Sequence, residues 1–243
     1  MRIYGQTDTG CIRPNNQDAF CFGELSPGAS FAVVCDGMGG ANGGSVASSL
    51  AVDTIAEKLK SGYQDGMTQA SFLHLLESAV SAANALVYDE SMADADLRGM
   101  GTTVVAAIVQ DGQAYLAHVG DSRIYLADGD TLQQLTRDHS IVQEMVEKGQ
   151  LTPQEAKYHP RKHFITRAVG VDSRVTCDFL VTDFPSTARL LLCTDGLTNM
   201  LETDSILSVV GETEDPAQIP ARLIDLAKQA GGNDNITVVL ILP

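Results

Sequence analysis

Seven short segments rich in β-branched, aliphatic and aromatic residues are spread over the whole chain, and they restrict its fold more than any other feature. They are RIYGQTD (2–8), FAVVCD (31–36), TTVVAAIVQ (102–110), AYLAHVG (114–120), RIYLA (123–127), LLLC (190–193) and ITVVLIL (236–242). Such runs predict strands, and ADGDT (127–131) predicts a hairpin turn before LQQLT. Apolar residues at helical spacing predict long helices over 43–60 and 71–88, and another over about 216–230. Strands and helices do not alternate regularly, so the order favours α+β layers over a doubly wound sheet.

Composition indicates an ordinary globular protein. The 243 residues suit one domain, which we expect to span 1–243, because no Pro/Gly-rich linker divides the chain. A formal net charge of −15 argues against nucleic acid as a partner, since phosphate backbones require a basic surface. The N-terminus has no apolar signal region, and we expect no membrane span.

The cysteines favour a reducing compartment. There are five, an odd number without a C-x-x-C pair, which argues against both a disulfide framework and a zinc site. Cys35 and Cys193 lie in apolar runs and are predicted to be small buried side chains. A cytoplasmic location is therefore expected.

Five aspartates occupy short polar or glycine-flanked segments: Asp18, Asp36, Asp121, Asp195 and Asp234. Three of them, Asp36, Asp121 and Asp195, follow apolar runs that read as buried strands. If the strand ends converge, the carboxylates repel one another and their pKa values rise. Hard cations such as Mg²⁺ or Mn²⁺ relieve that repulsion, because they take oxygen ligands. The pattern predicts a carboxylate-rich metal centre.

The segment 138–173 differs from its surroundings. It is polar, contains two short helical patterns and holds three of the five histidines, His139, His159 and His163. A long segment of this kind beside a site is often a mobile flap. A lone histidine is more often a surface or hydrogen-bonded residue than a catalyst, so these three are candidates for an effect on substrate access only.

Each motif also has an ordinary structural interpretation. Asp-Gly is common at turns, Arg13 before Pro14 can be a solvated loop residue, and Asp121-Ser122-Arg123 can be an ion-paired turn. The glycine-rich stretch 37–44 lacks the G-x-x-x-x-G-K-[ST] pattern, which argues against a nucleotide-binding loop.

Six motifs in order nevertheless carry a specific resemblance: CIRPNNQDAF, VVCDGMGGANGG, MGTTVVAAI, HVGDSRIY, LLLCTDGL and GGNDNITVV. Together they resemble the bacterial metal-dependent protein phosphatases of the PPM family, also called type 2C, from Gly5 to the C-terminus. The resemblance implies a four-layer α-β-β-α sandwich, with two central antiparallel sheets flanked by helix pairs. It also implies two core Mn²⁺ or Mg²⁺ ions at one end, and a third, weaker one.

The resemblance assigns roles residue by residue. It implies Asp36 and Arg13 as catalytic residues, with Arg13 gripping the substrate phosphate. The implied metal ligands are Asp36 as the bridge, the Gly37 backbone carbonyl, Asp195 and Asp234, with Asp18 acting through water and Asp121 at the third ion. Asn235 and Thr237 correspond to residues that orient Asp234. Met38 replaces the histidine that some members carry there, and the acid for the leaving group is left open between His163 and a metal-bound water.

The implied activity is hydrolysis of phosphoserine and phosphothreonine in proteins by a metal-activated water, opposing a Ser/Thr kinase. Two other classes are weighed against it. A catalytically silent binding module is disfavoured because it has no need for mutually repulsive carboxylates. A simple cation-binding protein is disfavoured because no D-x-[DN]-x-[DN]-G loop is present and Arg13 would have no purpose there.

Overall fold

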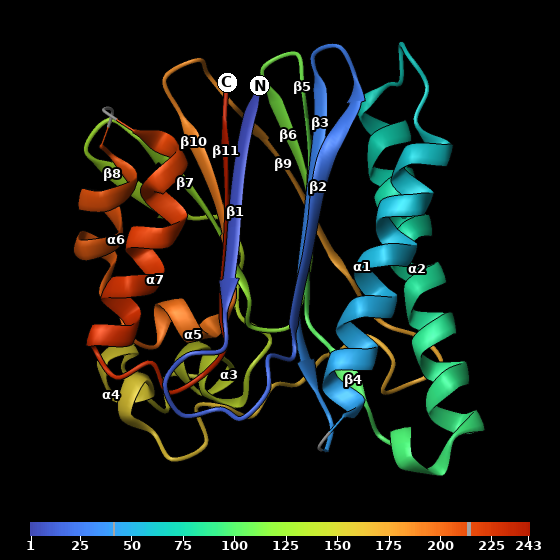
Figure 1. Cartoon of the computed structure of the whole chain (residues 1–243), viewed down its shortest axis with the longest axis vertical. Helices are drawn as coiled ribbons and strands as arrows, with labels where there is room; N and C mark the ends of the chain where they lie inside the picture. Colours follow the sequence, from blue (N-terminus) through green and yellow to red (C-terminus); the bar gives the residue numbers. More distant parts are fainter. Residues whose placement is uncertain (41, 213–214) are drawn as a thin grey trace.

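Two antiparallel sheets face each other and are covered on their outer sides by helices (Figure 1). The computed structural model describes residues 1–40, 42–212 and 215–243. The four layers confirm the predicted α+β class and the α-β-β-α arrangement.

The first sheet has five strands. The second has six, one of which is a short strand paired to the end of another. In spatial order the first sheet contains β1 (Arg2–Asp8), β11 (Ile236–Leu242), β10 (Arg189–Cys193), β7 (Arg123–Asp128) and β8 (Thr131–Gln134). The second contains β2 (Asp18–Ser26), β3 (Ala29–Met38), β5 (Val104–Gln110), β6 (Gln113–Val119) and β9 (Asp178–Asp183), with β4 (Gly101–Thr102) paired to the end of β3. All seven predicted strands are present, and Asp128 pairs with Thr131 across the predicted hairpin turn.

Helices α1 (Gly43–Gly62) and α2 (Gln69–Ala93) cover the second sheet, and α6 (Thr203–Val210) and α7 (Ile219–Gln229) cover the first (Figure 1). The shorter helices are η1 (Ala95–Leu97), α3 (Ile141–Glu147), α4 (Pro153–Tyr158), α5 (Asp195–Thr198) and η2 (Pro216–Gln218). The two long predicted helices are found and extend a few residues further. The predicted C-terminal helix divides into η2 and α7, with Ile219 and Leu223 buried as expected.

Strand alternation distributes the core over three layers. On β3, Phe31, Val33 and Cys35 pack towards α1 and α2, whereas Ala32 and Val34 pack between the sheets. Successive side chains of a strand point to opposite faces, so a strand covered on both sides reads as a continuous apolar run. Each fully buried aliphatic side chain contributes roughly 1.5–3 kcal/mol to folding.

The sequence prediction missed the strands β2 and β9, the helix α6 and the short helices η1 and α5. The strands β2 and β9 lie at the two edges of the second sheet, where each has side chains open to solvent. Edge strands carry polar residues, and β2 also shifts register between Glu24 and Ser26, so neither shows a clear apolar run. The helix α6 has only eight residues, too few for a persuasive repeat.

The expectation that no segment approaches a membrane span needs correction for α2, which is long and apolar enough by length and composition. Its apolar face, including Phe72, Leu76 and Val80, is buried against the core of the protein. This is the behaviour of a core helix in a globular protein.

Strand ends from both sheets meet at one end of the sandwich. There β1, β3, β6 and β10 finish and β2, β5, β7 and β11 begin, whereas the two chain termini lie at the opposite end (Figure 1). Antiparallel pairing thereby gathers short polar loops from distant parts of the sequence at a single edge.

Candidate functional site

The five aspartates singled out in the sequence come from these converging loops. Asp18 opens β2 and lies directly opposite Asp36 near the end of β3. Asp121 follows β6, Asp195 follows β10 as the first residue of α5, and Asp234 precedes β11. The structure therefore brings together residues separated by more than 200 positions.

Burial and crowding together raise the pKa values of four of these carboxylates. Burial raises the pKa of Asp18 to about 7, and the charges of Asp195 and Asp234 act in the same direction. Burial also holds the pKa of Asp36 well above its usual range, followed by the charges of Asp18 and Asp195. The pKa values of Asp121 and Asp195 are raised by burial first and then by neighbouring carboxylates. Each charge hinders ionisation of the others.

Asp18 is held by hydroxyl groups on one of its two oxygens. Its Oδ2 accepts hydrogen bonds from the hydroxyls of Thr237 (2.6 Å) and Thr194 (2.9 Å). Because the Thr237 hydroxyl donates its proton to Asp18, the Thr7 hydroxyl 2.7 Å away donates to Thr237, and Thr7 accepts in turn from the Asn16 amide. The other carboxylate oxygen, Oδ1, is buried without a partner. The network thus orients an unpartnered oxygen within the acidic cluster.

The backbone around Asp36 is closely fitted. The Asp36 N–H donates to the Thr103 hydroxyl (2.9 Å), and the Gly37 N–H donates to the Gln17 carbonyl (3.1 Å). A Cβ at position 37 would lie 2.0 Å from the Gly44 carbonyl oxygen, so only glycine fits. Glycine follows Asp36 because the chain segments around residues 37 and 44 approach each other closely.

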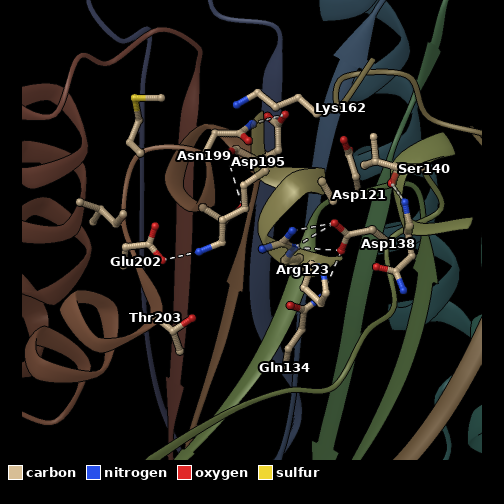
Figure 2. Close-up of a pocket in the computed structure, with 18 of the residues that line it drawn as sticks. Asp121, Arg123, Gln134, Asp138, Ser140, Lys162, Asp195, Asn199, Glu202 and Thr203 are labelled. Carbon is tan, nitrogen blue, oxygen red and sulfur yellow. Dashed lines mark hydrogen bonds and ion pairs between the residues drawn. The ribbon is translucent and has the colours of Figure 1, made fainter. Parts of the chain in front are cut away.

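Asp121 and Asp195 line the same cavity, which has a volume of about 520 Å³ (Figure 2). The Asn199 side chain donates to Asp195 Oδ2 (2.8 Å), whereas Asp195 Oδ1 is buried without a partner. Behind them Arg123 binds Asp138 through three hydrogen bonds of 2.7–3.2 Å. Arg123 therefore forms an ion pair, but with Asp138 rather than with Asp121.

Arg13 reaches the opposite side of the aspartate group. Its Nη2 donates to Asp234 Oδ2 at 2.8 Å, and about half of the Arg13 side chain is exposed (51%). Asp234 Oδ1 accepts from the Asn235 backbone N–H (2.9 Å). An arginine held by a carboxylate but open to solvent can turn its remaining donors towards an arriving anion.

Asn235 organises the loop that carries Arg13. Its side-chain amide donates to the carbonyls of Thr9 (2.9 Å) and Asn15 (3.0 Å), and its Oδ1 accepts from the Gln17 N–H (2.8 Å). The prediction that Asn235 and Thr237 both orient Asp234 is wrong for Thr237, whose hydroxyl binds Asp18. The reason is register: Thr237 pairs with Thr7 on β1, two positions beyond the Asp234 loop.

The arrangement suits a hard cation. Buried, unpartnered oxygens on Asp18 and Asp195 lack the partner that a buried carboxylate needs, and a divalent ion would supply it. Among residues 1–40, 42–212 and 215–243, no group of three or more Asp, Glu, His or Cys side chains is already arranged to hold a metal ion. An ion such as Mg²⁺ usually takes only one or two carboxylates and keeps several waters, so the donor set fits it.

The three histidines of the 138–173 segment have different environments. His139 is buried (5% exposed) and is a hydrogen-bonded residue, since its Nδ1 accepts from the Gly120 N–H (3.0 Å). His159 follows α4, and its Nδ1 accepts from the Arg161 N–H (3.2 Å). His163 is exposed, and a positive charge at its position would lower the pKa of Asp195, against the larger effects of burial and Asp234. Only His163 combines solvent exposure with proximity to the aspartates.

The supporting hydroxyls and amides of the site escaped the sequence prediction. They are Thr7, Asn16, Thr103, Thr194 and Asn199. Thr194 directly before Asp195, and Thr103 in MGTTVV, lie inside quoted motifs, but threonine is so common near strand ends that nothing marked them as contacts.

Comparisons with known proteins agree with this geometry. A family model for protein phosphatase 2C matches residues 13–226. The chain belongs to the protein phosphatase 2C family. It is therefore a protein serine/threonine phosphatase, as the six motifs predicted.

Individual members of the phosphatase 2C family align over nearly the whole chain. The serine/threonine phosphatase stp of Listeria welshimeri is 39% identical over 99% of this chain and 95% of its own length. A structure of the S. agalactiae serine/threonine phosphatase superposes with a TM-score of 0.93 at 34% identity, covering 99% and 98% of the two chains. The catalytic domain of PstP, solved in complex with two manganese ions, superposes with a TM-score of 0.86 at 34% identity over 98% and 96%.

Proposed function

We propose that this phosphatase hydrolyses phosphoserine and phosphothreonine in proteins with water as the nucleophile, and that it depends on Mn²⁺ or Mg²⁺. The observation that carries the proposal is a half-buried group of four aspartates with raised pKa values, two of which have a carboxylate oxygen that is buried without a partner. A folded protein retains such a group at a cost in stability. Cation binding offsets that cost, and the relative solved with two manganese ions supports the same reading.

We assign the residues as follows. Asp36, Asp195, Asp234 and the Gly37 carbonyl would hold two core ions, and Asp121 with Asp195 would hold a third. Asp18 would act through a water, since its hydroxyl network leaves one oxygen free. When bound, the cations supply charge neutralisation at the phosphoryl oxygens and activation of the attacking water.

Arg13 supplies the contact with the phosphate. Its guanidinium can share its donors between Asp234 and the equatorial oxygens of the phosphate group, where charge is greatest during transfer. As the new P–O bond to water forms, the bond to the seryl or threonyl oxygen breaks, and that oxygen requires a proton. His163 is the protein group we favour as its donor, because it is exposed and near Asp195.

Phosphorylated proteins are the proposed substrates, and a Ser/Thr kinase with opposite action is the proposed partner. A cytoplasmic location accords with the five free cysteines, of which Cys35 and Cys193 are fully buried. The alternative, a catalytically silent binding module, is weakened by the complete set of aspartates together with Arg13.

The test is hydrolysis of p-nitrophenyl phosphate and of a phosphothreonine peptide by the metal-stripped protein, with Mn²⁺, Mg²⁺ or Ca²⁺ added back. Asp36→Asn serves as the matched variant, because it preserves the shape of the side chain and removes its charge. We expect turnover with Mn²⁺ or Mg²⁺ and none in the variant. A folded wild-type protein that is inactive with every metal would favour the silent module, and an active Asp36→Asn would remove Asp36 from the bridge.

A further inference from the structure

His139 forms two reciprocal hydrogen bonds with the residue just before Asp121. The Gly120 N–H donates to His139 Nδ1 (3.0 Å), and the His139 N–H donates to the Gly120 carbonyl (2.7 Å). Gly120 has a φ of +107°, and a Cβ there would lie 2.6 Å from the Thr103 side chain. The turn therefore requires glycine at position 120, and His139 lies against it through both hydrogen bonds.

The loop that carries Asp121 is held on both sides by Asp138 and His139, the first two residues of the 138–173 segment, which form its root. Behind Asp121, Arg123 is bound by Asp138, the neighbour of His139. Between them the Ser122 hydroxyl lies 2.7 Å from that of Thr103, which accepts from the Asp36 N–H. Asp121 accepts a hydrogen bond from its own backbone N–H. Its carboxylate is positioned by the loop, and the loop is positioned by residues 138 and 139.

The chemical state of His139 suits an acceptor role. Because Nδ1 accepts from Gly120, the proton of the neutral ring lies on Nε2, which donates to Asp178 Oδ2 at 3.1 Å. Arg167 Nη1 also lies 3.1 Å from Nε2, but both groups carry hydrogens, so no hydrogen bond joins them. Arg167 Nη1 donates instead to Asp178 Oδ1 (2.8 Å). Burial lowers the pKa of His139, Asp178 opposes this shift, and Arg167 supports it. The ring also stacks on His118 (4.5 Å between centroids), whose pKa is lowered by burial to about 4. Both rings are therefore neutral near pH 7.

We propose that His139 is a positioning residue: by accepting the Gly120 N–H at Nδ1, it sets the Asp121 carboxylate against Asp195 for the third cation. This rests on the proposed function, since it concerns the third ion of that site. It assigns to the root of the 138–173 segment a role in ion affinity that is separate from substrate access.

Replacing His139 by asparagine or by glutamine separates the positioning role from a general effect on stability. Asparagine places its side-chain oxygen near the position of Nδ1 and can still accept from Gly120, whereas glutamine places its oxygen near Nε2 and cannot. Both lose the ring and its stacking on His118. A structural role would make the two variants alike, and a positioning role makes them differ.

The experiment is a Mn²⁺ titration of the whole, metal-stripped protein at pH 7, in which electron paramagnetic resonance counts free Mn²⁺. It compares wild type, Asp121→Asn, His139→Asn and His139→Gln. We expect two tight ions in every protein, and a third, weaker ion in wild type and His139→Asn. In His139→Gln the third ion should bind roughly 10–100-fold more weakly, and Asp121→Asn should lose it. The tight ions serve as the control for folding.

Each failure has its own signature. A third ion that binds His139→Gln as it binds wild type, while Asp121→Asn loses it, would overturn the role of His139 alone. A wild type without a third ion, or an Asp121→Asn that keeps it, would overturn the third position and this inference together. Failure of the proposed function would instead appear as absent hydrolysis with every metal. Nitrogen NMR of the metal-free protein gives a second test, because a proton on Nδ1 of His139 would also overturn the proposal.

Discussion

Asp18 and Asp36 face each other directly across the β2–β3 pair. Like charges at opposite positions of an antiparallel pair destabilise a sheet. Here both groups are also half-buried among further carboxylates, so the metal-free protein stores electrostatic free energy at this end of the sandwich. A bound cation would release it, which links metal binding to stability.

The first prediction concerns pH and the metal-free protein. The pKa of Asp18 is raised from 3.8 to about 7, so the folded state binds this proton more tightly than the unfolded state. Its contribution to stability is complete below about pH 4 and is lost as the pH rises towards 7 and above. Asp18→Asn has no proton to lose. We expect wild type to become less stable relative to this variant as the pH rises, by on the order of 4 kcal/mol in total.

Urea unfolding in the presence of a chelator, at several pH values between about 4 and 8, measures this difference. Protonation of the buried His118 and His139 destabilises the protein in the opposite direction, as the pH falls. Both histidines are present in wild type and in Asp18→Asn, so their effect cancels in the difference between the two proteins. Parallel stability curves for wild type and Asp18→Asn would contradict the raised pKa. Saturating Mn²⁺ should remove the relative loss in wild type.

The second prediction concerns the hydroxyl network. Thr237→Val removes the 2.6 Å hydrogen bond to Asp18 while keeping the shape of the side chain. We expect a roughly 10–100-fold loss in activity or in apparent Mn²⁺ affinity, as is usual for groups that orient metal-binding residues. Thr7→Val, one step further from Asp18, is the matched control and should lose less. Equal losses in the two variants, measured as kcat against Mn²⁺ concentration, would argue against a directed network.

The third prediction concerns Arg13. Removing a charged hydrogen-bond donor costs about 1.5–3 kcal/mol, so Arg13→Ala should lower kcat/KM about 10–100-fold. Arg13→Lys keeps the charge but loses the forked donor geometry, and we expect an intermediate value. The measurement is steady-state hydrolysis of a phosphothreonine peptide at saturating Mn²⁺. A lysine variant with wild-type kinetics would mean that Arg13 acts only as a point charge.

The fourth prediction concerns Asn235. Asn235→Ala removes three hydrogen bonds that hold the loop around Arg13, and leaves the Gln17 N–H and the Thr9 and Asn15 carbonyls without this partner. We expect a loss of about 3 kcal/mol in the free energy of unfolding and a raised KM, because Arg13 is no longer held near the site. The exposed neighbour offers a control, and Asn233→Ala should change neither quantity. An Asn235→Ala protein of unchanged stability would contradict the anchoring role.

Strands and site residues were predictable to different degrees, for physical reasons. The strands β3, β5 and β11 are buried on both faces, so their apolar runs are continuous in the sequence. The edge strands β2 and β9 are partly solvated and gave no such run. Asp36, Asp121 and Asp195 were found because each ends an apolar run, and Asp18 and Asp234 were found because they lie in motifs that carry the family resemblance.

The supporting contacts depend on register, which the sequence does not display. Thr7 and Thr237 are 230 positions apart and meet only because β1 pairs with β11. His139 lies in a polar segment, yet it is buried because Gly120 turns back against it. Such positions become visible only when distant strands are aligned.

The placement of β11 between β1 and β10 has a consequence for how the protein is made. This strand is the last along the chain, yet it is an interior member of its sheet. During synthesis β1 cannot pair with β11 until residues 236–242 have left the ribosome, and Asp234 leaves just before them. Long-range pairing of this kind slows folding, because distant segments must be brought together before any contact forms. A nascent chain therefore holds no complete aspartate cluster until residues 234–242 have left the ribosome.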